Sequence, residues 1–426
     1  MRVLDLTVVY AGPYLSMLLA DLGAEVIRVE NVHAWPTFTR GIRPAPMVED
    51  VGAESGWPIG YPAHDPGEYW WERFPFGLPL HRNKKSVTIN LKSTSGREYF
   101  YRLVAKCDVV VENNSPSAID RLGVGYDELV KCRPDLVRLR APAFGLSGSY
   151  REIKGFGSHI ESFIGHSLLR GYEDADPTSN QEMNSGDNAT AGTGVFAVLA
   201  ALHHRDRTGK GQLVEVAQVE NSAHLFPQAI MDFSLNRRVS STKGNRDLTG
   251  LWFNGVFACR GDDRWLAVSA GAAEEWRALA GAIERPELAD DPRFADGGGR
   301  EAHREQAEGA VAAWCAGQDQ VVAMYRLQAA GVAAGPVMDP RDGLESPQLW
   351  ARGFWRRLHH RFTGTWEWPG PPFRLSAGDH AESLPPPGLG AHNEYVYREI
   401  VGVSTAEYAE LVASGEIGTR YAPGAW

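Results

Sequence analysis

Two aspartates in a short acidic turn are the side chains best suited to covalent chemistry. Asp174 and Asp176 lie in the segment "RGYEDADPTS", which contains Gly171 and runs through a proline. A carboxylate with an ordinary pKa of about 3.9 is ionised near neutral pH, so either aspartate would be a nucleophile without a separate base. On residue types alone the turn itself explains both side chains, because aspartate is common beside proline in loops.

The spacing of cysteines and histidines disfavours disulfide and metal chemistry. His203 and His204 are adjacent, which is poor spacing for two ligands on one helix face. The four cysteines stand far apart without a CxxC pair, which is typical of buried thiols in a reducing cytoplasm. They are Cys107, Cys132, Cys259 and Cys315. The sequence therefore predicts no metal site and no disulfide framework.

Composition is that of a folded cytoplasmic protein. The chain has 426 residues, 43% of them hydrophobic, with a formal net charge of −10. Nucleic-acid binding normally requires a basic face, which this charge disfavours, although a local basic patch for a small anion remains compatible with it. No run of 18 apolar residues occurs and Met1 leads directly into a strand-like segment, so we expect no signal peptide and no membrane span.

The first thirty residues predict a β-α-β unit. The run "VLDLTVV" is typical of a strand, and Pro13 is well placed in the first turn of the helix that follows. Leucines recur at helical spacing from Leu15 to Leu22, Gly23 ends the helix, and "AEVIRVE" predicts a second strand. A β-α-β unit implies parallel strands with helices on the faces of the sheet.

The same alternation recurs further along the chain. Strands are predicted at "SVTINL", "DVVVEN", "DLVRLRAPAF" and "QLVEVAQ". Helices are predicted over 96–106 and 189–204, and the second is rich in small residues suited to close packing. The fold class is therefore α/β with a parallel sheet.

A change of pattern near residue 245 indicates a second domain. The segment "FNGVFACRGDDRWLAVSA" predicts an antiparallel hairpin, and 274–332 is mostly helical. We expect a large α/β domain over 1–235, to which 341–426 returns, and a smaller α+β domain over 245–340. The insert 33–83, rich in Pro, Gly and Trp, is expected to wrap over the surface. The Pro- and Trp-rich arm 340–390 is expected to lie against another subunit or domain.

Several segments in a fixed order carry a family resemblance over residues 2 to about 420. They are "VLDLTVVYAGPYLSMLLADLGAEVIRVEN", "NKKSVTINLK", "VVVENNSPSAIDRLGVGYDEL", "HHRDRTGKGQLVEV", "GVAAGPV", "ARGFW" and "PPFRLS". In these the chain resembles the family III CoA-transferases, the CaiB/BaiF type that includes formyl-CoA and carnitine CoA-transferases. The resemblance implies a Rossmann-like large domain, an intertwined homodimer, coenzyme A as substrate and product, and no tightly bound cofactor.

The resemblance also implies a nucleophile. In the family an aspartate stands in a turn reading roughly Thr-Gly-x-x-Asp-Gly-Pro, and three residues after Gly171 comes Asp174. One extra residue precedes Pro177 here, which leaves Asp176 as a rival. The implied reaction moves CoA from an acyl-CoA thioester to a free carboxylic acid through aspartyl anhydride and aspartyl-CoA thioester intermediates. Backbone N–H groups for the oxyanion and exclusion of water would complete the site.

Positions that contact CoA in the family carry over residue by residue. They are Ala11, Ile89, Asn90, Leu91, Lys92, Asn113 and Arg121. The cations of Lys92 and Arg121 suit the adenosine phosphates. The segment Lys243–Gly255, "KGNRDLTGLWFNG", stands where relatives have a mobile glycine-rich loop, and it is the expected lid.

Four positions depart from the pattern of relatives. Tyr10 stands where some have a glutamine, Asn31 where some have a CoA-binding arginine, and Pro142-Ala143 where the formyl-CoA branch has lysine-glycine. These departures argue against formyl-CoA:oxalate specificity. The aromatic segment Glu68–Leu80 suggests a bulkier acyl group, although tryptophan clusters more often serve packing.

Two other functions remain open. An α-methylacyl-CoA racemase would need a histidine in a Gly-His-Asp segment, where this chain has Phe156, and a later aspartate, which Asp187 matches. His159 stands three residues from Phe156, on a different side of the helix or turn. The other alternative is a non-catalytic subunit of a hetero-oligomeric CoA-transferase, since the "EDAD" turn is shifted. The acyl-CoA and carboxylic acid partners themselves are not specified by the sequence.

Overall fold

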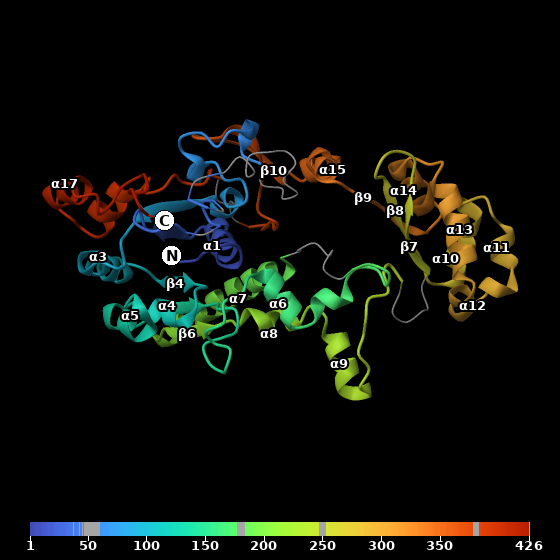
Figure 1. The fold of residues 1–426 in the computed structure, drawn as a ribbon, viewed down its shortest axis with the longest axis horizontal. Coiled ribbons are helices and arrows are strands. Elements are labelled where there is room, and N and C mark those ends of the chain that lie inside the picture. The colour runs from blue at the N-terminus through green and yellow to red at the C-terminus, as the bar shows by residue number, and fades with distance from the viewer. Residues whose placement is uncertain are drawn as a thin grey trace. The chain divides into compact units, whose positions relative to one another are not determined.

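A computed structural model describes residues 1–36, 38–41, 43, 44, 46, 60–176, 184–246, 253–377 and 383–425. The chain divides into two compact units (Figure 1). The first comprises Met1–Gly165, Glu182–Met231 and Gly353–Trp426, and the second comprises His166–Gln181 and Asp232–Arg352. The domain limits given above stay a prediction.

A six-stranded sheet forms the centre of the first unit. Its order is β3-β2-β1-β4-β5-β6, and every neighbouring pair is parallel. The predicted α/β class with a parallel sheet is confirmed. The strands are β1 (Arg2–Asp5), β2 (Glu25–Glu30), β3 (Lys84–Thr88), β4 (Val109–Glu112), β5 (Val137–Arg140) and β6 (Gln212–Glu215).

Helices cover both faces of this sheet because successive strand side chains point to opposite sides. Val3 of β1 belongs to the core shared with α1 and α7, whereas Leu4 belongs to the core shared with α3, α5 and the C-terminal helices. α7 approaches α1 closely, since a Cβ on Gly194 would lie 2.1 Å from Leu15 Cδ1. The helices are α1 (Ala11–Asp21), α3 (Thr94–Val104), α4 (Pro116–Arg121), α5 (Tyr126–Cys132), α6 (Gly157–Phe163), α7 (Ser185–Thr208), α8 (Gln218–Ala223), α9 (Pro227–Asn236) and α17 (Thr405–Ala413).

The C-terminal segment covers the outer edge of β3. The Asn393 side chain accepts from Thr88 N at 2.8 Å, and His392 N donates to Ser86 O at 2.9 Å. A π-helical turn, Tyr395–Ile400, and a hairpin of β10 (Trp355–His360) with β11 (Gly364–Pro369) belong to the same stretch of chain. The edge strand thus has its backbone groups satisfied within the chain.

The insert 33–83 does not simply wrap over the surface, and that expectation was wrong for its described part. Arg40, Glu72 and Phe74 are buried, with 5%, 1% and 1% of their surface exposed. Arg40 forms ion pairs with Glu30 of β2 and with Glu72, so the insert is bonded to the sheet. Its short 3₁₀ turns are Pro62–His64, Trp70–Glu72 and Leu78–His81.

The second unit contains a three-stranded antiparallel sheet of order β7-β8-β9. The predicted hairpin is confirmed as β7 (Phe253–Ala258) and β8 (Trp265–Ala270), and β9 is Ala333–Val337. Trp276, 2% exposed, lies in the core between this sheet and the helices. The helices are α10 (Ala273–Ala282), α11 (Glu287–Asp290), α12 (Gly297–Ala302), α13 (Arg304–Cys315), α14 (Gln320–Ala329), α15 (Pro340–Glu345) and α16 (Pro347–Ala351). Over the described residues, no helix of either unit has the length and apolarity needed to cross a membrane.

Candidate functional site

The parallel sheet has a topological switch point between β1 and β4, its two central strands. Open sheets of this kind bind ligands outside the carboxyl ends of the strands at such a point. Ala11 begins α1 directly after the β1 loop, and Asn113 follows the last residue of β4. Ile89–Lys92 follow β3 at the same edge. The fold therefore brings these positions, predicted from the sequence, to one edge of the sheet.

Asn113 holds the loop between β1 and α1 in place. Its Oδ1 accepts from Val8 N at 2.9 Å, and its Nδ2 donates to Val8 O at 3.0 Å. A Cβ on Gly12 would lie 2.4 Å from Thr7 Cβ and 2.9 Å from Asn113 Cγ, so the loop can close this tightly only at glycine. Val9, in the same loop, has a φ of +63°, an uncommon conformation for a β-branched residue.

The segment after β3 presents mainly main-chain atoms at this edge of the sheet. Ile89 and Leu91 bury their side chains in the core, so only their main-chain atoms are available to a ligand. Asn90 Oδ1 accepts from Lys92 N at 3.2 Å and from Asn31 Nδ2 at 3.3 Å. Asn31 therefore links the ends of β2 and β3, and Lys92 is left exposed.

A further cation, Arg97 of α3, joins two of these segments and was not found from the sequence. Its NH1 donates to Leu91 O and Lys92 O at 3.2 Å each. Its Cδ lies 3.3 Å from the position of a Cβ on Gly123, two residues after Arg121. Arg121 is exposed and donates to Ser117 Oγ at 3.0 Å. In the sequence Arg97 is an ordinary helical position four residues after Ser93, so no pattern pointed to Arg97.

Asp187 is bonded to the start of α1. Its Oδ1 accepts from Ala11 N at 3.2 Å, and only 6% of the residue is exposed. A Cβ on Gly157 would lie 2.0 Å from Asp187 Oδ2, which means that the α6 backbone packs directly on the carboxylate. Asp187 thus connects α1, α6 and α7 in the first unit.

The residues at the positions that a racemase would use for proton transfer have structural roles in this chain. Phe156 precedes α6 and is 44% exposed. His159 Nδ1 accepts from Phe156 N at 3.2 Å, so one ring nitrogen caps the helix. An imidazole used in this way has only its other nitrogen for proton transfer.

The acidic turn lies in the second unit. Gly171 has a φ of +94°, and its carbonyl accepts a hydrogen bond from Thr242 Oγ1. Asn245 Nδ2 donates to Tyr172 Oη at 2.8 Å. Asp174 follows in this turn with an exposed side chain. The turn is therefore held by 240–245, a segment distant in sequence.

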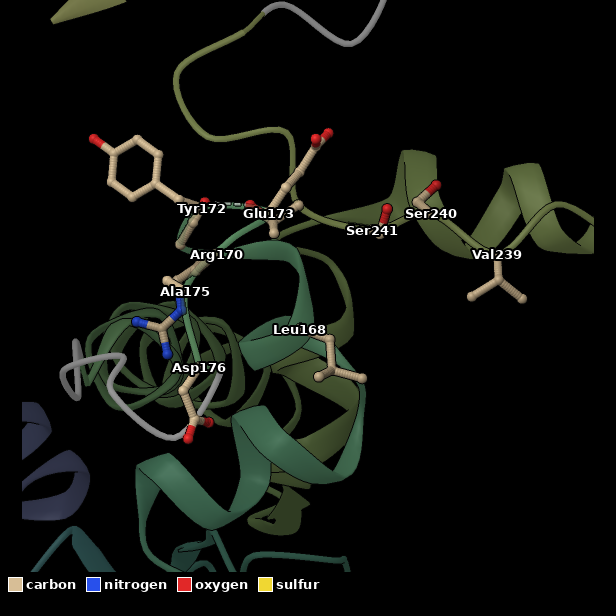
Figure 2. A pocket seen from close by; sticks show the side chains of 11 residues that line it. Leu168, Arg170, Tyr172, Glu173, Ala175, Asp176, Val239, Ser240 and Ser241 are labelled. Carbon is tan, nitrogen blue, oxygen red and sulfur yellow. Dashed lines mark hydrogen bonds between the residues drawn. The ribbon is translucent and has the colours of Figure 1, made fainter.

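A pocket of about 340 Å³ lies beside this turn (Figure 2). Its lining includes the charged residues Arg170, Glu173 and Asp176 and the hydroxyl residues Ser240, Ser241 and Thr242. Asp176 lines the pocket, whereas Asp174 stands outside its lining. Residues 247–252 of the expected lid and Pro177 lie outside the described residues, and Phe253–Gly255 of the lid belong to β7.

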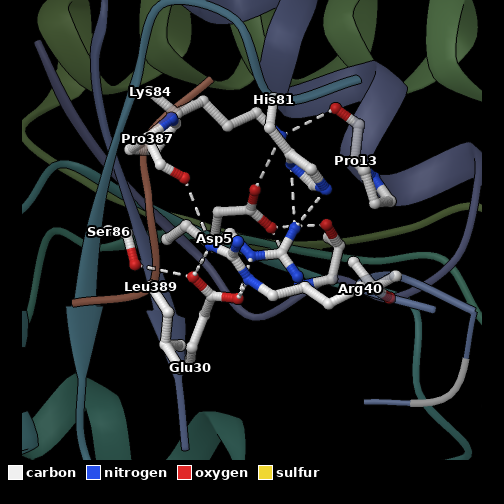
Figure 3. A network of polar contacts seen from close by, with 12 residues as sticks. Asp5, Pro13, Glu30, Arg40, His81, Lys84, Ser86, Pro387 and Leu389 are labelled. Atoms are coloured by element: carbon white, nitrogen blue, oxygen red, sulfur yellow. Dashed lines mark hydrogen bonds and ion pairs between the residues drawn. The ribbon is translucent and has the colours of Figure 1, made fainter. Parts of the chain in front are cut away.

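A buried ionic network joins side chains of β1, β2 and β3 (Figure 3). Lys84 Nζ donates to Asp5 Oδ2 and Pro13 O at 2.9 Å each. Burial opposes ionisation of Asp5, but Lys84, Arg28 and hydroxyl donors outweigh it and lower its pKa. Burial lowers the pKa of Lys84 to about 8, against the pull of Asp5. The network links the last residue of β1 to the first residue of β3 and, through Pro13, to α1.

Comparison with known proteins finds CoA-transferases both by family and by individual relatives. The family described as CoA-transferase family III matches residues 1–393. Succinyl-CoA–D-citramalate CoA-transferase of Chloroflexus aurantiacus is 31% identical, covering 97% of this chain and 96% of that protein. The beta subunit of succinyl-CoA–L-malate CoA-transferase from the same species is 28% identical, covering 96% and 95%.

A solved structure agrees with the fold as well. The crystal structure of a CAIB/BAIF family protein from Brucella suis superimposes with a TM-score of 0.78 at 25% identity, covering 94% of this chain and 98% of that one. The family match spans nearly the whole chain and takes in both the switch point and the acidic turn. The chain therefore belongs to the family III CoA-transferases.

Proposed function

We propose that the chain transfers CoA from an acyl-CoA thioester to a free carboxylic acid, with Asp174 as the covalent nucleophile. The observation that carries this proposal is the position of Asp174 three residues after Gly171, with an exposed side chain, in a chain of this family. Thr242 supports the start of the turn by donating to Gly171 O, three residues before Asp174.

The proposed reaction balances without any external base. The Asp174 carboxylate attacks the thioester carbonyl and CoA thiolate leaves, which gives a mixed anhydride. The thiolate then attacks the aspartyl carbonyl of the anhydride, releasing the donor acid as carboxylate and leaving an aspartyl-CoA thioester. The acceptor carboxylate attacks that thioester, and the released thiolate takes the acceptor acyl group, restoring Asp174.

CoA is proposed to bind at the switch point of the sheet. Lys92 and Arg121 would face its phosphates as exposed cations, and the backbone of Ile89–Leu91 and Ala11 would lie along the ligand. Asn90 and Asn113 would act mainly by holding the loops, since both side chains bond to protein groups.

We also propose that the chain forms an intertwined homodimer. Large apolar side chains stand exposed on both units, with Phe196 of α7 at 74% and Leu235 of α9 at 73%. Exposed apolar side chains that gather on one helix, as Ile230, Phe233 and Leu235 do on α9, are typical of protein–protein contact. A monodisperse monomer in light scattering at micromolar concentration would contradict the homodimer.

A hetero-oligomer with a related subunit is the second candidate, favoured by the relative that is named as a beta subunit. The two are separated by assaying the purified chain alone with a panel of acyl-CoA donors and acids. Succinyl-CoA is the first donor to test, because two of the relatives described above are named for it. Exchange by the chain alone supports a complete enzyme, and exchange only after a partner is added supports a subunit.

A further inference from the structure

We propose that four aromatic side chains beside the start of α1 receive the acyl group and select acids with an apolar, ring-sized body. This aromatic wall consists of Tyr10, Phe38, Phe76 and Phe156. The inference rests on the proposed CoA transfer and goes beyond it by naming the class of acid. All four residues belong to the first unit.

The wall consists of two ring pairs whose loops are joined by one hydrogen bond. Tyr10 and Phe76 have ring centroids 5.8 Å apart, and Phe38 and Phe156 have centroids 5.5 Å apart at 72°. Both are favourable aromatic geometries. Val9 N donates to Thr39 Oγ1 at 3.1 Å, which connects the residue before Tyr10 to the residue after Phe38. The two pairs therefore lie next to each other.

The wall lies next to the proposed CoA site. Gly157 follows Phe156 in the chain and packs on Asp187. Asp187 in turn accepts from Ala11 N, directly after Tyr10. The loop that carries Tyr10 and Ala11 is the one that Asn113 holds at the switch point. An acyl group attached to CoA at this edge would reach the wall.

The rings leave apolar surface available for contact. Phe156 is 44% exposed although it is fully apolar, and Tyr10, Phe38 and Phe76 are half-buried. A ligand ring that packed against them would bury this surface, and it would gain the offset and edge contacts that aromatic pairs prefer.

Charge at the wall disfavours an acyl group with a second carboxylate. Within the described residues, no arginine or lysine stacks on any of the four rings. Burial raises the pKa of Tyr10, and Tyr14 and the carboxylate of Asp187 add to the increase, so Asp187 lies close enough to act on this ring electrostatically. A dicarboxylic acyl group would bring its second carboxylate against apolar rings and towards the like charge of Asp187, which costs desolvation and repulsion.

The test compares thioesters in an Asp174→Asn background, so that acyl transfer does not consume them. Calorimetry would measure the affinities of CoA, succinyl-CoA and phenylacetyl-CoA for this protein and for added Phe156→Ala or Phe38→Ala. Phe163→Ala is the matched control, because Phe163 is 53% exposed and contacts Phe144 and Tyr150 instead. Each wall variant should weaken phenylacetyl-CoA by about tenfold or more and leave CoA affinity unchanged.

The outcomes separate this inference from the proposed function. The wall is supported when phenylacetyl-CoA binds at least about tenfold more tightly than succinyl-CoA and both wall variants remove the difference. Tighter binding of succinyl-CoA, or a preference that survives both variants, overturns it. Aromatic preference without CoA exchange by the unmodified protein, either alone or with a related subunit added, would keep the wall and refute the transfer reaction. A protein that binds no CoA thioester refutes both.

Discussion

Replacing Arg40 with methionine should destabilise the protein strongly, because it leaves two carboxylates buried without their shared cation. Arg40 Nε and NH2 donate to the two oxygens of Glu30 at 2.6 and 2.7 Å, and NH1 donates to Glu72 Oε2 at 2.6 Å. Figure 3 shows Arg40 beside Glu30 in this network. Glu30 and Glu72 are 7% and 1% exposed.

The two carboxylates keep different partners after Arg40 is removed, and this sets the size of the destabilisation. Glu30 keeps Arg28 at 3.1 Å and the Ser86 hydroxyl at 2.6 Å. Among the described residues, Glu72 keeps only neutral donors, Leu389 N at 2.7 Å and Trp71 Nε1 at 3.1 Å. The loss is therefore close to that of one broken buried ion pair, about 3–5 kcal/mol in the free energy of unfolding.

The loss should depend on pH. Burial raises the pKa of Glu72 even with Arg40 present, from an ordinary value of 4.5, and removing Arg40 raises it further. A group with a raised folded pKa contributes stability below its unfolded pKa and loses that contribution as pH rises through the folded pKa. The deficit of Arg40→Met relative to the unmodified protein should therefore be larger at about pH 8 than at about pH 5.

Urea unfolding followed by tryptophan fluorescence measures both effects, since Trp71 packs beside Glu72. The double variant Arg40→Met/Glu72→Gln should recover part of the loss, because it also removes the stranded charge. Lys131→Met is the matched control: its pair with Glu128 is exposed on both sides and should contribute little. A deficit below about 1 kcal/mol, or one equal at both pH values, would refute the account of this network.

Two further predictions concern the switch point. Gly12→Ala should abolish measurable CoA binding in calorimetry, because a methyl group there meets Thr7 and Asn113, whereas Gly192→Ala, with open space around it, should bind normally. Arg97→Gln should raise KM for the acyl-CoA by about tenfold with kcat nearly unchanged, because the two carbonyls that it orders belong to the CoA-binding segment. Arg102→Gln, on the same helix, is its control, and equal KM values in the two variants would contradict the role of Arg97.

The sheet could be predicted because each strand and helix leaves a local signal. Buried parallel strands appear as short apolar runs such as "VVVEN", and α7 shows its close packing through small residues such as Gly194. The hairpin of the second unit is equally local, since Gly261 and its neighbours join two adjacent strands. These features need only a short stretch of sequence to specify them.

The interior of the insert and much of the site could not be predicted, because their contacts are distant in sequence. Arg40 and Glu72 are separated by 32 residues, and Ala11 and Asp187 by 176. A buried arginine looks the same in sequence as an exposed one until its partners are known. The acidic turn is similar, because Thr242, which supports it, stands 71 residues away from Gly171. Spacing in the sequence alone therefore could not decide whether Asp174 or Asp176 is the nucleophile.

The most direct test of the account is to identify the residue acylated during turnover. The protein is incubated with a productive acyl-CoA, trapped with hydroxylamine or borohydride, digested and analysed by mass spectrometry. We predict one modified peptide spanning Gly171–Pro177, with the label on Asp174. Asp174→Ala should show neither label nor CoA exchange, and Asp176→Ala should keep most of both. Labelling of Asp176, with loss of activity in Asp176→Ala alone, would contradict the assignment, and full activity in both variants would refute the anhydride mechanism.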